Sequence, residues 1–161
     1  MSGGIHVVLV DAEATVDLGR RLAGHVGAGD LVVLSGDLGA GKTTLTRGLG
    51  ERLQVRGPVT SPTFVIARRH PSEVGGPDLL HVDAYRLTSA AEVDDLDLDL
   101  TGAVAVVEWG SGRVEHLSDS RVEILLREDA GGRVAELVCV GPRWDDQAVA
   151  RLAADIAAAA P

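Results

Sequence analysis

The sequence lacks the features of disulfide-rich, secreted and membrane-spanning proteins. Its 161 residues include one cysteine, Cys139, in an apolar segment, so no disulfide can form within the chain. A solitary cysteine of this kind is typical of a buried core position in a protein of a reducing compartment. No apolar run approaches the length of a membrane helix, and the N-terminus has neither the basic nor the apolar region of a secretion signal. We therefore expect a cytoplasmic protein without a membrane partner.

Basic residues are also scarce. Lysine and arginine together number 15 against 24 acidic residues, which gives a formal net charge of −9. Autonomous binding to nucleic acid needs clustered basic side chains that release the counterions of the phosphates, so this composition argues against it. If RNA enters the biology, we expect another protein to hold it.

What the sequence does contain is an alternation of apolar strand patterns and amphipathic helix patterns. The strand expected at 31–35 is apolar on both faces, as in central strands covered by helices. Asp11 and Ser89 are candidate N-caps, and the helix after Asp11 is expected to run to about Gly27. Near the C-terminus, two strand patterns flank a turn with Gly-Gly, which predicts a hairpin, and an alanine-rich helix follows. The order of elements predicts one α/β domain over residues 1–161, with a mixed sheet that is parallel in its centre.

The most specific local pattern is Gly-Asp-Leu-Gly-Ala-Gly-Lys-Thr at residues 36–43. It matches G-x-x-x-x-G-K-[ST], the P-loop or Walker A motif, and it lies between an apolar strand and a segment with helical spacing. Glycines allow such a loop to wrap with its backbone N–H groups pointing at an anion, and the following helix adds the positive end of its dipole. The motif therefore predicts a P-loop NTPase-like three-layer fold with a site for nucleotide phosphates.

Each residue of the motif has an expected part in that site. Lys42 should reach the β- and γ-phosphates, the Thr43 hydroxyl should coordinate Mg²⁺, and Thr44 can donate to the α-phosphate. The rest of the loop should surround the phosphates, with its first two side chains as structural members: Asp37, Leu38, Gly39, Ala40 and Gly41. The usual guanine-reading motif N-K-x-D needs an asparagine, and the chain has none, so ATP is favoured as the nucleotide, together with Mg²⁺.

Three further blocks follow the P-loop: Ser-Pro-Thr-Phe at 61–64, His-Val-Asp-Ala-Tyr-Arg-Leu at 81–87 and Val-Val-Glu-Trp-Gly at 106–110. Together with the P-loop, these blocks and their spacing resemble the TsaE (YjeE) family, the bacterial ATPases of tRNA threonylcarbamoyladenosine synthesis. The resemblance covers the chain from its first strand to about Trp109. It implies an ATP hydrolase that sustains the turnover of a TsaD–TsaB complex and meets tRNA only through these partners. TsaD modifies the adenosine beside the anticodon in tRNAs that read codons beginning with A.

Two carboxylates end apolar strands and are candidates for the chemistry. Glu108 ends the run Ala-Val-Ala-Val-Val, and the carboxyl end of a central parallel strand is where such sheets bind ligands. A Walker B acid holds Mg²⁺ at this place in other P-loop proteins, and the resemblance implies the same role for Glu108. Asp83 ends a second apolar strand and could position the attacking water or the magnesium shell, unless it only caps the following turn. His81 lies on the same strand face as Asp83 and could be functional or structural.

Four residues are weaker candidates for a switch or a partner contact. Thr63 could sense the γ-phosphate and Mg²⁺ as a switch I threonine does, although a rigid turn set by Pro62 explains its block equally well. Arg86 could act as an arginine finger, but pairing with a local carboxylate is favoured. Tyr85 and Trp109 belong to the three aromatics, of four in the chain, that fall inside the motif blocks, which hints at nucleotide or partner contacts.

A P-loop indicates that a protein binds phosphate groups, but it does not determine which reaction the protein catalyses. A small-molecule kinase is one alternative; it would need an acceptor pocket and a mobile lid with arginines, for which 113–121 is the only suitable segment. A nucleotide-gated binding module with incidental hydrolysis is another.

Overall fold

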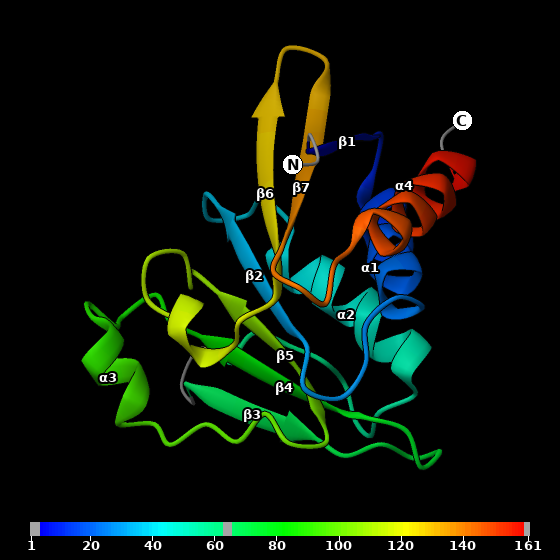
Figure 1. Ribbon diagram of the computed structural model, residues 1–161. Coiled ribbons are helices and arrows are strands. Elements are labelled where there is room, and N and C mark those ends of the chain that lie inside the picture. The colour runs from blue at the N-terminus through cyan, green and yellow to red at the C-terminus, as the bar shows by residue number, and fades with distance from the viewer. Residues whose placement is uncertain (1–3, 63–65, 160–161) are drawn as a thin grey trace.

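The computed structural model describes residues 4–62 and 66–159 and has an α/β architecture in three layers (Figure 1). Its elements follow in this order: β1 (Ile5–Leu9), α1 (Ala12–Ala23), β2 (Leu31–Gly36), α2 (Lys42–Leu53), β3 (Ala67–His70), β4 (Asp78–Asp83), α3 (Ala90–Asp94), β5 (Ala103–Glu108), the short 3₁₀ helix η1 (Glu115–Leu117), β6 (Arg121–Asp129), β7 (Gly132–Val140) and α4 (Asp146–Ala159). The predicted α/β fold is confirmed, including the C-terminal hairpin β6–β7 and the final helix. Within the described ranges, no helix has the length and apolarity needed to cross a membrane.

Seven strands form one sheet in the spatial order β1-β7-β6-β2-β5-β4-β3. The central strands β6, β2, β5 and β4 run parallel to one another. At the two sides, β7 and β1 follow β6 in antiparallel pairing, and β3 pairs antiparallel with β4. The predicted mixed sheet with a parallel centre is therefore confirmed. The carboxyl ends of β2, β5 and β4 meet at one edge, which is where open α/β sheets bind ligands.

Helices α1, α2 and α4 cover one face of the sheet, while α3 and η1 lie on the other (Figure 1). Strand β2 contributes side chains to the cores on both faces of the sheet. Its Val32 and Leu34 belong to the core beneath α1, α2 and α4, whereas Leu31 and Val33 belong to the opposite core. This arrangement explains why the strand is apolar on both faces. Trp144, the aromatic outside the motif blocks, is buried in the larger core.

Helix α2 is held against α1 at very short range. A Cβ atom on Gly19 would lie 2.1 Å from the carbonyl oxygen of Leu45, and one on Gly48 would lie 2.0 Å from that of Val16. A side chain at either glycine would therefore force the two helices apart. The close packing fixes the position of α2, and with it the helix start at Lys42.

The helix caps agree with the sequence, but one helix is shorter than expected. The side chains of Asp11 and Ser89 each accept a hydrogen bond from a backbone N–H three residues on, as predicted. Helix α1 ends at Ala23 rather than near Gly27, since Gly24 is its C-cap and glycines have low helix propensity.

The hairpin turn also differs from the expected one. Asp129 pairs with Gly132, so the hairpin turn consists of Ala130 and Gly131 rather than of the two glycines. Strand β3 begins at Ala67, and residues 63–65 before it lie outside the described residues.

Candidate nucleotide-binding site

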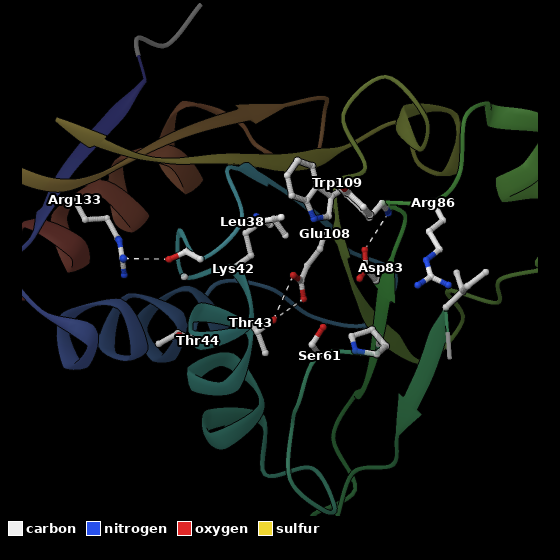
Figure 2. A pocket seen from close by; sticks show the side chains of 15 residues that line it. Leu38, Lys42, Thr43, Thr44, Ser61, Asp83, Arg86, Glu108, Trp109 and Arg133 are labelled. Atoms are coloured by element: carbon white, nitrogen blue, oxygen red, sulfur yellow. Dashed lines mark hydrogen bonds between the residues drawn. The ribbon is translucent and has the colours of Figure 1, made fainter. Parts of the chain in front are cut away.

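A cavity of about 610 Å³ opens at the edge where β2, β4 and β5 end (Figure 2). The P-loop forms one wall, and the residues that follow β4 and β5 form another. The lining residues are Leu38, Gly39, Gly41, Lys42, Thr43, Thr44, Ser61, Pro62, Ile66, Asp83, Tyr85, Arg86, Glu108, Trp109 and Arg133. The fold therefore brings most of the sequence-predicted site residues together in one place.

Lys42 lies within the curve of the P-loop. It is only 5% exposed, and its Nζ donates hydrogen bonds to the carbonyl oxygens of Gly36 and Asp37 at 2.7 and 2.8 Å. Nζ also lies 4.1 Å from the centre of the Trp109 ring, which is within the range of a cation–π contact. Burial lowers the pKa of Lys42, while nearby carboxylates, Glu108 foremost, act in the opposite direction.

Glu108 connects the P-loop helix with the sheet. Its carboxylate is buried and accepts a hydrogen bond from the Thr43 hydroxyl, whose Oγ1 lies 3.1 Å from Oε2 and 3.3 Å from Oε1. Oε2 also lies 2.5 Å from Nε2 of His81, a fully buried ring on the neighbouring strand β4. Because a carboxylate only accepts, Nε2 is the donor. His81 thus holds Glu108 in place beside Thr43.

Asp83 lies beside Glu108 because the two residues end neighbouring parallel strands in register. Its Oδ1 accepts a hydrogen bond from the backbone N–H of Tyr85 at 3.0 Å, so it caps the turn that follows β4. Its side chain also lines the cavity (Figure 2). Asp83 therefore both caps the turn and lines the cavity, although the sequence left a turn cap and a site residue as alternatives.

An exposed rim borders the cavity. Leu38 in the P-loop is 76% exposed, and Tyr85 is 54% exposed. The rings of Tyr85 and Trp109 meet edge to face, with centroids 5.0 Å apart. Trp109 has a left-handed backbone with φ of +63°, which is uncommon for a bulky residue and is found disproportionately at functional sites. The aromatic residues of two motif blocks therefore meet directly above the candidate site.

The remaining candidates occupy opposite sides of the cavity. Thr44 lies on the side of the P-loop helix, and Arg86 lies beyond Asp83 (Figure 2). Across residues 4–62 and 66–159, no carboxylate forms an ion pair with Arg86, so the favoured local pairing is not seen there. Thr63 lies outside the described residues, although Ser61 of the same block lines the cavity.

Comparison with known proteins agrees with this arrangement of motifs. The family model described as threonylcarbamoyl adenosine biosynthesis protein TsaE matches residues 9–135 of the chain. The chain belongs to the TsaE family.

Other TsaE proteins match over most of their length. The tRNA threonylcarbamoyladenosine biosynthesis protein TsaE of Streptomyces coelicolor is 57% identical over 145 residues, 85% of this chain and 98% of the relative. The protein of the same name from Bacillus subtilis is 36% identical, over 84% of this chain and 86% of the relative. Among solved structures, the crystal structure of Bacillus subtilis YdiB superposes with a TM-score of 0.76 and 28% identity, covering 96% of this chain and 97% of that one. The P-loop NTPase-like fold expected for a TsaE protein is therefore confirmed.

Arg133 also lines the cavity, although it belongs to none of the sequence motifs. It stands at the start of β7, 94 residues from Gly39, and its Nη2 lies 3.3 Å from the Gly39 carbonyl oxygen. Arg133 reaches the P-loop only because β7 pairs with β6, next to β2. That strand order leaves no local signal in the sequence.

The oxygen atoms of Thr43 and Glu108 suit a hard cation. Mg²⁺ binds oxygen ligands at roughly 2.1 Å in an octahedron, so neighbouring ligand oxygens lie about 3 Å apart. The 3.1 Å separation between Thr43 Oγ1 and Glu108 Oε2 matches that geometry. Among the described residues, no group of three or more Asp, Glu, His and Cys side chains could hold a metal alone. The site therefore fits an ion that takes further ligands from phosphate and water, as Mg²⁺ does.

Proposed function

We propose that this chain binds and hydrolyses Mg-ATP in support of tRNA threonylcarbamoyladenosine biosynthesis. The observation that carries the proposal is the convergence of Lys42, Thr43 and Glu108 on one cavity at the end of a P-loop. The pathway follows from membership of the TsaE family and from relatives named for that biosynthesis. Together they support an ATPase that serves a tRNA-modifying system.

Phosphate binding would be the task of the loop and the first turn of α2. Lys42 is placed to engage the β- and γ-phosphates, aided by the backbone N–H groups and the dipole of the helix start. Thr43 and Glu108 are the residues that would hold Mg²⁺, which when bound neutralises charge on the phosphate oxygens. His81 keeps the carboxylate of Glu108 turned towards Thr43 through its 2.5 Å contact.

Asp83 is the residue best placed to orient the attacking water. Its Oδ1 is taken by the Tyr85 N–H, which leaves Oδ2 to accept a hydrogen bond from a water molecule in the cavity. Phosphoryl transfer depends mainly on positioning and on stabilising charge, so a carboxylate that orients the water suffices without a strong base. The pairing of Asp83 with Glu108 across β4 and β5 would keep the water close to the phosphate that it attacks.

The proposed partners are TsaD and TsaB, in the cytoplasm, with tRNA contacted only through them. The net charge of −9 is unfavourable for a direct grip on tRNA phosphates. The exposed side chains of Leu38 and Tyr85 offer apolar surface beside the nucleotide site. A partner that covers this rim would be in a position to respond to the nucleotide beneath it.

The kinase alternative has less support. A kinase lid would have to come from residues 113–121, but Val114 is fully buried and Arg113 donates to the Trp109 carbonyl oxygen at 2.6 Å. A segment anchored in this way is a poor mobile lid, so hydrolysis is favoured over transfer to an acceptor.

Phosphate release from ATP by the purified chain, alone and with TsaD and TsaB, tests the proposal. We expect slow release that the partner pair accelerates, and none above background with Lys42→Ala. ATP turnover only in the presence of a metabolite that becomes phosphorylated would instead establish a kinase. Nucleotide binding without hydrolysis in any mixture would favour the binding module, and indifference to TsaD and TsaB in both binding and turnover would refute the partnership.

A further inference from the structure

Arg113 does not line the cavity, yet its side chain reaches the turn that carries Trp109. Nη1 of Arg113 donates a hydrogen bond of 2.6 Å to the carbonyl oxygen of Trp109. Within residues 4–62 and 66–159, no carboxylate forms an ion pair with Arg113. In that part of the chain, the charge of this guanidinium is therefore directed at a backbone oxygen rather than at an acidic partner.

Trp109 has a backbone conformation that needs support. Its N–H continues the pairing of β5 with β2 by donating to the carbonyl oxygen of Leu34 at 2.9 Å. The chain then leaves the strand with Trp109 in the left-handed region, at φ of +63°, which a bulky residue keeps only where its surroundings impose it. A charged donor on the Trp109 carbonyl oxygen stabilises this turn and satisfies a backbone group that has left the sheet.

The segment that carries the donor is itself anchored. The backbone N–H groups of Arg113 and Val114 donate to the carbonyl oxygen of Gly110 at 2.8 and 3.2 Å. The Glu115 carboxylate accepts a further hydrogen bond from the N–H of Val114 at 3.0 Å. The side chain of Val114 is fully buried in the smaller core. Arg113 therefore joins Trp109 to a segment that is fixed to the sheet.

The ring of Trp109 connects this support to the P-loop. Its centre lies 4.1 Å from Nζ of Lys42, and its edge-to-face contact with Tyr85 borders the cavity. Figure 2 shows Trp109 beside the P-loop at the cavity. The ammonium of Lys42 also donates to the carbonyl oxygens of Gly36 and Asp37. The ring and the two carbonyl groups together restrict Lys42 to the curve of the P-loop.

We infer that Arg113 is a positioning residue that holds Trp109 over Lys42 and so prepares Lys42 for a phosphate group. This inference rests on the proposed binding of ATP. A lysine side chain that is already held in the P-loop loses less conformational freedom when the phosphate binds, which raises the affinity for the nucleotide. Arg113 acts on the site through Trp109 and does not touch the nucleotide itself.

Tryptophan fluorescence reports the position of Trp109 without any nucleotide. The chain has two tryptophans, so Trp144→Phe leaves Trp109 as the only one. In this background, Arg113→Met keeps the aliphatic stem and removes the donor. We expect the emission of Trp109 to shift to longer wavelength and its quenching by acrylamide to increase, because the ring is released from Lys42. Unchanged emission together with unchanged quenching would overturn the inference.

Calorimetry with Mg²⁺ and the non-hydrolysed analogue AMP-PNP reports the effect on Lys42. Arg113→Met and Trp109→Ala should each weaken binding by about two- to tenfold, which corresponds to the cost of ordering one long side chain. The double variant should bind as Trp109→Ala does, since Arg113 acts through the ring, and additive losses would overturn the inference. Arg113→Lys keeps a charged donor and should recover part of the affinity. A loss equal to that of Arg113→Met would show that the donor is unimportant and would also overturn the inference.

Arg143→Met is the matched control. Arg143 also donates to a backbone carbonyl oxygen, that of His25 at 2.9 Å, and lies 4.7 Å from the ring centre of Trp144, but it does not line the cavity. AMP-PNP affinity should not change in this variant, and a loss equal to that of Arg113→Met would overturn the inference by showing a general structural effect. A wild-type chain that binds no AMP-PNP would refute the proposed function, whereas the fluorescence comparison would still show whether Arg113 holds Trp109.

Discussion

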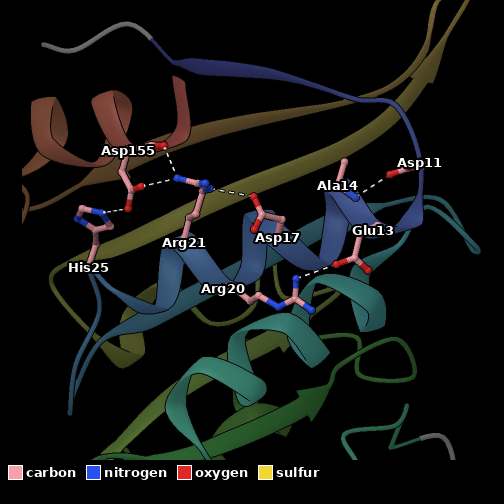
Figure 3. Close-up of polar contacts among 8 residues, drawn as sticks. All are labelled: Asp11, Glu13, Ala14, Asp17, Arg20, Arg21, His25 and Asp155. Carbon is pink, nitrogen blue, oxygen red and sulfur yellow. Dashed lines mark hydrogen bonds and ion pairs between the residues drawn. The ribbon is translucent and has the colours of Figure 1, made fainter. Parts of the chain in front are cut away.

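The cavity and the polar cluster between α1 and α4 contain similar side chains in opposite settings. The α1–α4 cluster consists of Asp17, Arg21, His25 and Asp155 (Figure 3). Arg21 donates to Asp17 at 2.8 Å and to Asp155 at 2.7 Å, and His25 lies 2.9 Å from Asp155. All four side chains remain between 18% and 38% exposed. The four side chains pair with one another and link α1 to α4.

At the cavity, Glu108 and the neighbouring His81 are buried and less completely paired. Glu108 and His81 are 4% and 0% exposed, and Nδ1 of His81 has no partner among the described residues. Burial of charged and polar groups costs stability unless every group is well paired. The comparison indicates that the mutually paired, partly exposed cluster serves packing, whereas the buried pair of Glu108 and His81 is consistent with the proposed role of Glu108 in binding a ligand.

The largest effect is expected from Glu108→Gln. The amide keeps the shape of the side chain but not its charge, so ATP hydrolysis should fall about a hundredfold or more. The free energy of unfolding should be equal or higher, since the variant no longer buries a carboxylate. Phosphate release and urea denaturation measure the two quantities. Undiminished hydrolysis would remove Glu108 from the metal site, and a large loss of stability would contradict the comparison between the two regions.

A smaller effect is expected from His81→Ala. Groups that orient a metal ligand contribute about ten- to a hundredfold to metal affinity or activity, so the Mg²⁺ concentration for half-maximal hydrolysis should rise by a factor in this range. His81→Gln, which can still donate to Glu108, should recover part of the loss. His70→Ala is the control, since this buried histidine contacts the Arg56 carbonyl oxygen at 3.2 Å and does not line the cavity. An equal change in Mg²⁺ dependence for His70→Ala would show that the effect is only structural.

The sequence was informative where function requires particular residues next to one another in the chain. The P-loop, the ends of β4 and β5 and the hairpin follow from local patterns, because glycine, terminal carboxylates and apolar strands each act within a few residues. The contacts between strands could not be predicted in this way. The bond from His81 to Glu108 depends on the register of β4 against β5, and the position of Arg133 depends on the order of β7 and β6. These are outcomes of long-range packing, which local patterns in the sequence do not reveal.

In the α1–α4 cluster, Arg21→Ala should affect stability and leave the chemistry unchanged. The variant loses the ion pairs with Asp17 and Asp155, and since all three side chains are partly exposed we expect a loss of about 1 kcal/mol or less in the free energy of unfolding. Urea denaturation measures this loss. ADP affinity and ATP hydrolysis should not change, because the cluster lies outside the lining of the cavity. A fall in hydrolysis that persists well below the unfolding transition would mean that the two regions are coupled.

The smallest effect concerns acid stability. Hydrogen bonds from His25 and Arg21 hold the pKa of Asp155 below its usual range. A carboxylate with a lowered pKa in the folded state contributes stability above its unfolded pKa of about 3.9, and this contribution is lost as the pH falls through the folded value. The difference in unfolding free energy between the wild-type chain and Asp155→Asn should therefore shrink as the pH falls from about 5 towards 3. Urea denaturation at a series of pH values measures it, and raised salt should reduce it because Asp155 is partly exposed. A difference that grows as the pH falls from about 5 to 3 would show that Asp155 is not held as a charged partner in the folded protein. The side chains of the α1–α4 cluster would then not satisfy one another, and the comparison with the cavity would fail.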